Sequence, residues 1–220
     1  MTNVTTPWTV AIRERTLIVV FPALYRVLSW APLGGGLVEA RAIINHQVRT
    51  DQSPAQEPEV FLRTLAQRLD LRTPVVGLMT GVKMERLVRR VVQHDAVTIE
   101  CCATVGLSNA LAVGDPATYK ESPGTINLIV VASQPLTVEA LIEAVTIVAE
   151  AKVRMLYAAG VRSTVSDALA TGTGTDCVAI ACPMGAPVHR YCGKHTRLGE
   201  LLGRVVGDAT EEGLRRIHDG

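Results

Sequence analysis

The chain has 220 residues, of which 48% are hydrophobic but only 4% aromatic, so a buried core must consist mainly of aliphatic side chains. The length fits one domain, which we expect to span residues 1–220. The 22 basic and 21 acidic residues leave a formal net charge of +1. This balance gives no electrostatic reason to expect nucleic acid or an anionic membrane as a partner.

The N-terminal region has the composition of short β-strands. Four segments are rich in β-branched or aromatic residues with partial alternation: Thr9–Arg15, Thr16–Phe21, Tyr25–Ala31 and Ala40–Val48. The run Leu17–Phe21 follows two arginines, as in a secretory signal peptide. However, Glu14 lies between these arginines, Pro22 follows the run, and the run is too short to cross a bilayer. We therefore expect a strand, no membrane span and a cytoplasmic location.

Helical and extended patterns alternate after this region. Apolar periodicity predicts helices over Glu59–Leu69 and Met84–Val92, the second with its arginines on the exposed face. Short β-branched runs predict strands over Val75–Met79, Val97–Thr104 and Ile126–Ala132.

The helix with the clearest signals follows the strand Ile126–Ala132. Thr137 is a suitable N-cap, Glu139 suits the first turn, and Gly160 is a suitable terminator. Residues at helical spacing form one stripe: Leu141, Val145, Val148, Lys152 and Leu156.

The last predicted helix begins near His195 and contains three glycines four residues apart. Gly199, Gly203 and Gly207 each cost about 1 kcal/mol against alanine in a helix interior. They lie on one face if the helix is continuous, where they permit close approach of another backbone or a bulky ligand. Alternatively, the helix is broken near Gly207 and the glycines are caps.

Two polar turns with similar sequences precede strands. Gly124–Asn127 and Gly174–Asp176 each lead into an apolar run about fifty residues apart. If the two strands are neighbours, the side chains of Asn127 and Asp176 converge at equivalent strand ends. Together these patterns predict a single α/β (α+β) domain with a mixed β-sheet, antiparallel N-terminal strands and C-terminal β-α units.

The segment Thr171–Asp176 combines two glycines, three threonines and a carboxylate directly before the apolar run Cys177–Cys182. Such a turn presents backbone N–H groups and hydroxyls at a strand edge. Polar groups at the ends of apolar elements are how a rigid scaffold presents chemistry. We therefore predict an enzyme whose site includes this turn.

A second polar segment, Tyr191–Thr196, brings the amine of Lys194 and the imidazole of His195 to a helix start. We expect this helix start and the glycine–threonine turn to face one cleft. Asp176 and His195 would then share acid–base work or hold a metal. The alternative is that either residue is a cap or a surface group.

Other motifs are missing from the sequence. There is no H-E-x-x-H, no C-x-x-C pair, no G-x-S-x-G elbow and no Walker loop, so we expect no metal. The turn at Gly172 and Gly174 lacks the third glycine of a dinucleotide fingerprint. Three of the five cysteines lie in apolar runs, which indicates reduced, buried thiols.

Three further histidines have weaker claims to a catalytic role. His189 lies in a sequence typical of an exposed loop. His46 follows an apolar run and faces either the same cleft or the surface. His94, beside Asp95, is placed as at a helix C-terminus.

Several segments, in order from about Leu28 to Ala209, form a recognisable set. They are Leu28–Gly36 with Asn45, Gly77–Thr80, Ala103–Ala110 with Gly114 and Asp115, Gly124–Asn127, Glu150–Lys152, Ala170–Asp176 and Gly193–Glu200. Through their number and order, the sequence resembles the adenosylcobinamide amidohydrolase family of cobamide salvage. It departs from the pattern at Trp30, where a second serine is expected after Ser29.

The resemblance implies hydrolysis of the amide that joins the aminopropanol arm to a propionyl side chain of an adenosylated corrinoid. The products would be adenosylcobyric acid and the amino alcohol or its phosphate, and a complete cobamide is an alternative substrate. No cofactor is firmly implied by the resemblance, and the corrinoid (adenosylcobinamide or a cobamide) is expected as the substrate. A non-catalytic corrinoid-binding or carrier protein is the alternative function, and a homo-oligomer is compatible with the sequence.

Amide hydrolysis needs an activated water or nucleophile, donors for the oxyanion and an acid for the amine. We expect Asp176 or His195 to activate water, and Asn127, Asn109 and the turn 172–175 to hold the carbonyl oxygen. The other expected substrate-binding residues are Gly35, Gly36, Asn45, Ser108, Thr173, Thr175 and Lys194. Of these, Lys194 would steady charge, and the glycines would let a flat macrocycle lie against backbone. A threonine nucleophile is an alternative without an obvious adjacent base.

Overall fold

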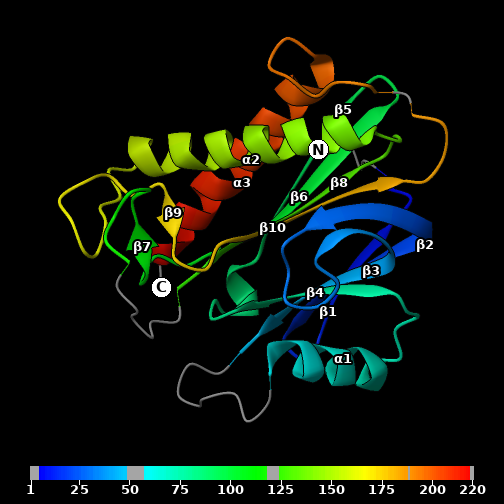
Figure 1. Ribbon diagram of the computed structural model, residues 1–220, viewed down its shortest axis with the longest axis horizontal. Helices are drawn as coiled ribbons and strands as arrows, with labels where there is room; N and C mark the ends of the chain where they lie inside the picture. The colour runs from blue at the N-terminus through cyan, green and yellow to red at the C-terminus, as the bar shows by residue number, and fades with distance from the viewer. Residues whose placement is uncertain (1–4, 49–56, 118–123, 188, 219–220) are drawn as a thin grey trace.

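Figure 1 shows the computed structural model of the protein, which describes residues 5–48, 57–117, 124–187 and 189–218. The strands are β1 (Thr9–Arg13), β2 (Thr16–Ser29), β3 (Gly36–Gln47), β4 (Val75–Thr80), β5 (Val88–His94), β6 (Val97–Val105), β7 (Ala110–Leu111), β8 (Ile126–Ala132), β9 (Gly172–Thr173) and β10 (Cys177–Pro183). The helices are α1 (Pro58–Arg68), α2 (Val138–Ala158) and α3 (Arg197–His218), and a 3-10 turn spans Met84–Arg86.

Within the described residues the main sheet has eight strands and is mixed, as predicted. Its order is β4-β3-β2-β10-β8-β6-β5, and β1 pairs with β2 beside this path. The pairs β3–β4 and β8–β10 are parallel, whereas the other pairs are antiparallel. The short strands β7 and β9 pair separately from the main sheet.

The sheet folds back on itself along its two longest strands. The register of β2 and β3 shifts between Val20 and Tyr25, a stretch that contains Pro22. Proline cannot donate to a neighbouring strand, so an irregularity is expected there. As a result, Leu17 of β2 and Ile129 of β8 are buried in the same hydrophobic cluster. We call the side of β6, β8 and β10 that faces this cluster the inner face.

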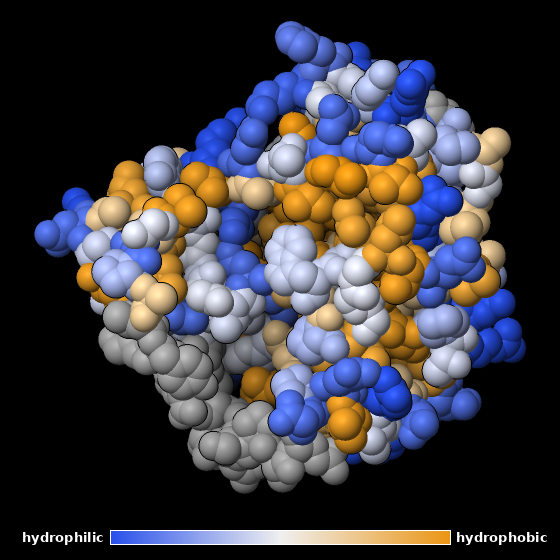
Figure 2. All heavy atoms as spheres, in the orientation of Figure 1, coloured by the Kyte–Doolittle hydropathy of each residue, from blue (hydrophilic) through white to orange (hydrophobic). Residues whose placement is uncertain are grey.

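The helices cover the outer sides of the folded sheet (Figure 1). Helices α2 and α3 pack on the other side of β6, β8 and β10, which we call the helical face, and bury Leu128 and Val130 of β8 there. Helix α1 packs on β3 and β4. Val138 and Ile142 of α2 remain 39% and 55% exposed, and Figure 2 shows apolar side chains gathered near this end of the helix. None of the described helices is long and apolar enough to cross a membrane.

Local signals predicted several elements correctly. The strand Ile126–Ala132 has the predicted bounds. The Thr137 hydroxyl accepts a hydrogen bond from the N–H of Ala140 at the start of α2, and Gly160 follows the helix with a φ of +64°. The run Leu17–Phe21 is part of β2. All five cysteines are buried free thiols.

The predicted helix over Met84–Val92 is wrong. Apart from the 3-10 turn at Met84–Arg86, this segment belongs to β5, which pairs with β6 in antiparallel register. The Arg89 guanidinium pairs at 2.7 Å with the carboxylate of Glu100 on the neighbouring strand. Pairing with β6 therefore overrides the helix-like spacing of the apolar residues.

Helix α3 is continuous through its glycines, which confirms the first of the two alternatives and excludes a break near Gly207. A Cβ at Gly199 would lie 2.3 Å from the carbonyl oxygen of Gly193, which means that the preceding turn needs this glycine. A Cβ at Gly203 or Gly207 would face Ile147 or Arg154 of α2 at 3.7 Å or 3.3 Å. The glycine face thus packs toward α2, and Gly199 and Gly203 also line a pocket of about 520 Å³ between α2 and α3.

Candidate active site

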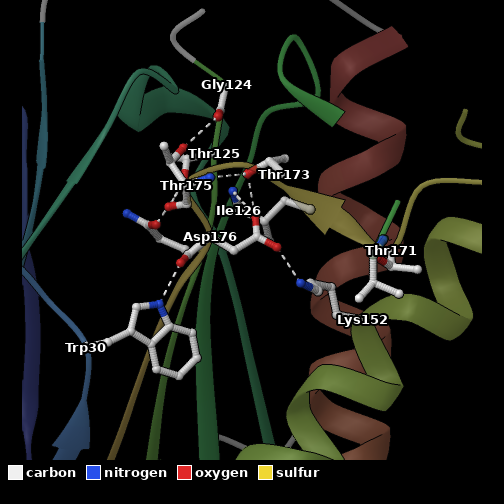
Figure 3. A network of polar contacts seen from close by, with 11 residues as sticks. Trp30, Gly124, Thr125, Ile126, Lys152, Thr171, Thr173, Thr175 and Asp176 are labelled. Carbon is white, nitrogen blue, oxygen red and sulfur yellow. Dashed lines mark hydrogen bonds and ion pairs between the residues drawn. The ribbon is translucent and has the colours of Figure 1, made fainter. Parts of the chain in front are cut away.

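The starts of β8 and β10 lie side by side, because these parallel strands pair with Cys177 opposite Asn127. Asp176, the residue before β10, has three partners near this edge. Its Oδ1 accepts hydrogen bonds from the N–H of Ile126 at 3.1 Å and the hydroxyl of Thr173 at 2.5 Å. Its Oδ2 pairs with the ammonium of Lys152. We call Asp176, Lys152 and Thr173 the Asp176 cluster, shown in Figure 3.

The ion pair of the Asp176 cluster is largely but not wholly enclosed. Both side chains are 12% exposed, so part of the pair remains in contact with solvent. Strand β9 passes close by at Gly172, where a Cβ would lie 2.3 Å from Oδ2 of Asp176 and 2.7 Å from Nζ of Lys152. A side chain at this position would force the ends of the Asp176 and Lys152 side chains to move, so glycine leaves the ion pair in place.

Hydroxyl and indole groups hold the turn before β10 in place. The Thr175 hydroxyl donates to the carbonyl oxygen of Gly124 at 3.0 Å, and the Thr125 hydroxyl donates to that of Thr175 at 2.7 Å. Trp30 Nε1 donates to the carbonyl oxygen of Asp176 at 2.7 Å. The two polar turns that the sequence predicts, before β8 and before β10, are therefore joined to each other by hydrogen bonds (Figure 3).

Asn127 and Asp176 occupy equivalent strand ends, as predicted, but the predicted convergence of their side chains is wrong. In the register of the two strands, Asn127 lies opposite Cys177 and not opposite Asp176. Because side chains alternate along a strand, this offset of one residue sends the two groups to opposite faces. Asp176 contacts α2 on the helical face, and Asn127 points to the inner face.

Asn127 is part of a buried network with Asn45. Both are 1% exposed. The amide of Asn127 donates to Asn45 Oδ1 at 2.9 Å and to the carbonyl oxygen of Met79 at 2.7 Å. Asn45 in turn donates to the hydroxyl of Thr104 at 3.1 Å. These bonds join the two layers of the folded sheet, and neither asparagine is presented to solvent.

A pocket of about 300 Å³ opens where the two layers meet, near this network. Thr80, Thr125, Thr175 and Cys177 contribute to its wall. Among the described residues that line it, Cys177 has the sole ionisable side chain, and burial raises the pKa of its thiol to about 11. The pocket wall thus offers hydroxyls but no group that exchanges protons near neutral pH.

Two other predicted binding residues support the turn before β10. A Cβ at Gly124 would lie 2.5 Å from Ser108 Oγ, and one at Gly174 would lie 2.9 Å from Asn109 Nδ2. The carbonyl oxygen of Asn109 accepts a hydrogen bond from the N–H of Gly174 at 3.1 Å. The structure thus brings Asn109 to the turn 172–175, as the sequence predicts.

Gly35 and Gly36 form the turn between β2 and β3. A Cβ at Gly35 would lie 2.7 Å from the carbonyl oxygen of Ala31, and Gly36 has a φ of +98°, which favours glycine. Gly36 is level with Ser29, the residue before Trp30. The two glycines therefore shape the chain beside the site.

The predicted common cleft for Asp176 and His195 is wrong. Lys194 pairs with Glu150 of α2 at 2.7 Å, whereas Asp176 pairs with Lys152. Residues two apart on a helix point about 200° apart around its axis, so the two ion pairs lie on opposite sides of α2. His195 is exposed, and no hydrogen bond or ion pair joins it to another residue in the part of the chain that the structure describes.

The remaining histidines lie away from the cluster. His46 is buried against Phe61 of α1, and its Nδ1 is 2.8 Å from the hydroxyl of Thr16, so it occupies neither the cleft nor the surface. His189 contacts Gln134 through Nε2 at 2.5 Å. His94 ends a strand rather than a helix. No group of three or more potential metal ligands gathers among the described residues.

Comparisons with known proteins bear on this arrangement. The profile of the family described as adenosylcobinamide amidohydrolase matches residues 3–219. An adenosylcobinamide amidohydrolase of Methanosarcina mazei is 31% identical over 83% of this chain and 86% of its own length. The chain belongs to the adenosylcobinamide amidohydrolase family.

Two further relatives agree with this membership. An adenosylcobinamide amidohydrolase of Halobacterium salinarum is 31% identical over 84% of this chain and 79% of its own length. An uncharacterized protein of Methanocaldococcus jannaschii, MJ1613, is 27% identical over 91% of this chain and 86% of its own length.

In this member of the adenosylcobinamide amidohydrolase family, sequence reasoning missed Lys152 as a site residue. Its place on the apolar stripe of α2 predicts a core-facing position, which is correct, but its partner Asp176 lies 24 residues further along the chain. A lysine on such a stripe needs a buried counter-charge. This need for a counter-charge was the signal that could have identified Lys152, since the glycine-rich turn before β10 contains the carboxylate of Asp176.

Proposed function

We propose that this chain hydrolyses the aminopropanol amide bond of adenosylcobinamide or a related cobamide. The products are adenosylcobyric acid and the amino alcohol or its phosphate, in cobamide salvage within the cytoplasm. The bond is a linear, non-peptide carbon–nitrogen amide. The observation that supports this proposal most is the partly accessible pair of Lys152 and Asp176 in a chain of this family.

The chemistry is assigned to the Asp176 cluster rather than to the pocket between the layers. Amide hydrolysis needs proton transfer to the leaving amine and charge stabilisation at the carbonyl oxygen. Hydroxyls in the pocket wall supply hydrogen bonds but no proton exchange near neutral pH. In contrast, the Asp176 cluster combines a carboxylate, an ammonium and a hydroxyl within direct contact.

The proposed mechanism uses two charged groups. Asp176 accepts a proton from water as the water oxygen bonds to the amide carbon. Lys152 has three N–H donors, of which Asp176 takes one, and another donates to the developing oxyanion. As the carbon–nitrogen bond breaks, the proton moves from Asp176 to the leaving nitrogen. In total, the oxygen of the water ends in the carboxylic acid, and one of its protons ends on the amine.

The remaining predicted residues hold this centre in place. Thr173 fixes the Asp176 carboxylate, and Asn109 and Thr175 fix the turn that carries it. Asn127 and Asn45 act as structural residues at the layer junction, because their amides are bonded to each other. His195 and Lys194 have no step in the mechanism, since α2 separates them from Asp176.

The test is a product analysis. The purified full-length protein is incubated with adenosylcobinamide, and the mixture is analysed by mass spectrometry. We expect adenosylcobyric acid and free aminopropanol in equal amounts. Retention of intact adenosylcobinamide by the protein without any aminopropanol release would favour the non-catalytic corrinoid-binding alternative. Repeating the incubation with a complete cobamide identifies which corrinoid is opened.

A further inference from the structure

Trp30 is an exposed aromatic residue in direct contact with the backbone of Asp176. It follows the last residue of β2, and 52% of its surface is exposed. Its Nε1 donates to the carbonyl oxygen of Asp176 at 2.7 Å. The hydrogen bond fixes the indole while leaving much of its ring surface in solvent.

The other tryptophan of the chain shows the usual arrangement. Trp8 is 2% exposed, and its Nε1 donates to the buried carboxylate of Glu100 at 2.6 Å. Trp30 also has a hydrogen bond for its polar edge, but its apolar faces lack the cover that Trp8 has. A large apolar ring fixed in water beside a reactive cluster is typical of a binding surface.

Trp30 lies on the same side of the sheet as the reactive groups. Ser29 points inward, where its hydroxyl bonds to Val178 and lies 3.9 Å from Cys177 Sγ. Leu28 packs with the cluster under α2 and α3. Alternation therefore sends Trp30, like Leu28, to the helical face, where Asp176 meets Lys152. Figure 3 shows the Trp30 and Lys152 side chains on either side of Asp176.

We propose that Trp30 is a specificity-determining residue that stacks on a flat conjugated ring of the substrate while the amide lies at the Asp176 cluster. This inference rests on the proposed function. An adenosylated corrinoid carries two flat conjugated systems, the macrocycle and the adenine. A fixed indole can stack on either of these two rings, and its side chain loses little conformational entropy on binding because it is already ordered.

Two substitutions separate the ring from its hydrogen bond. Trp30→Phe keeps a flat ring and removes the bond to Asp176, whereas Trp30→Ser removes both. Base-on-aromatic stacking is typically worth about 10-fold in affinity. We therefore expect Trp30→Ser to raise KM for adenosylcobinamide by about 10-fold, while any change in kcat that follows from the lost bond to Asp176 is shared by both variants. Trp30→Phe should keep KM within about threefold. Equal KM values for all three proteins would overturn the proposal.

A chemical measurement detects the contact without activity. The reagent 2-hydroxy-5-nitrobenzyl bromide alkylates accessible indoles, and peptide mass mapping reports each tryptophan separately. We expect Trp30 to react in the free protein and to be protected at least fivefold by saturating adenosylcobinamide. Trp8, which is 2% exposed, is the internal control and should not react. Unchanged modification of Trp30 in the presence of bound corrinoid would contradict stacking.

The same assays distinguish the two rings and separate this proposal from the proposed function. If a corrinoid without the adenosyl group also protects Trp30, the macrocycle is the stacked ring; protection by the adenosylated form alone assigns the adenine. Binding and protection without hydrolysis would refute the proposed function and keep the contact. Hydrolysis without protection or a KM change would refute the contact and keep the function.

Discussion

Lys152 of α2 and Asp176 before β10 form an ion pair beside Gly172 of β9, on the helical face of the folded sheet. The pair joins the helix layer to the strand edge at which two parallel strands begin. Its counterpart, Lys194 with Glu150, lies on the other side of the same helix and is far more exposed. The two lysines can therefore be compared directly, because each forms an ion pair with one carboxylate and each pair includes one residue of α2.

Replacing Lys152 with methionine should destabilise the fold. The substitution leaves the largely enclosed carboxylate of Asp176 without its counter-charge, which costs about 2–4 kcal/mol of unfolding free energy. Lys194→Met is the matched control and should cost less than about 1 kcal/mol, because its pair is exposed to solvent. Urea denaturation of both variants measures the difference. Equal losses would show that the enclosed pair contributes no special stability.

A methyl group at Gly172 should disturb the site more than the fold. Gly172→Ala places a Cβ where Asp176 and Lys152 now meet, so one partner must move. We expect kcat for aminopropanol release to fall at least 30-fold. The control is Gly203→Ala, whose Cβ meets Ile147 at an ordinary 3.7 Å and should stabilise α3 by about 0.5–1 kcal/mol. An active Gly172→Ala enzyme would argue against a catalytic ion pair.

His46 should make stability depend on pH. Burial lowers its pKa from 6.5 to about 4, so below pH 6.5 the unfolded chain takes up a proton that the folded chain does not. The unfolding free energy therefore falls as pH falls from 6.5 to 4, by up to about 3 kcal/mol. Above pH 6.5 both states are neutral at this residue and the contribution is constant.

The measurement for His46 is urea denaturation at pH 7.5 and pH 4.5. His46→Gln should lose much less stability between these two conditions than the original protein. His94→Gln serves as the control, since the His94 side chain is 45% exposed at the end of β5. An identical pH dependence in the original protein and His46→Gln would refute the assignment.

Thiol chemistry should be dispensable. Cys177 lines the pocket between the layers, but burial raises its pKa to about 11, which keeps the thiol protonated near neutral pH. Iodoacetamide at pH 7.5 should leave turnover unchanged, and Cys177→Ser should keep at least a third of the original kcat. Inactivation by iodoacetamide that Cys177→Ser abolishes would instead identify Cys177 as the nucleophile.

The elements that the sequence predicts well are those with local signals. The cap Thr137, the terminator Gly160 and the β-branched run Ile126–Ala132 each act within a few residues, and all appear as predicted. The helix predicted over Met84–Val92 is wrong because the edge strand β5 has apolar residues at helix-like spacing. Its identity is decided by β6, whose pairing does not follow from local spacing.

The site was predicted in part for a similar reason. The turn 172–175 and Asn109 were identified from composition and resemblance, and the structure brings them together. The relation between Asn127 and Asp176 depends on a one-residue offset in strand register, which no local pattern fixes. The separation of His195 from Asp176 depends on where α2 packs, a tertiary property.

The most direct test compares aminopropanol release from adenosylcobinamide by four variants that retain the original circular dichroism spectrum. Asp176→Asn and Lys152→Met should lower kcat by at least 100-fold, whereas His195→Ala and Lys194→Met should stay within threefold of the original. This result would place the chemistry at the Asp176 cluster. Inactive His195→Ala combined with active Lys152→Met would contradict the account.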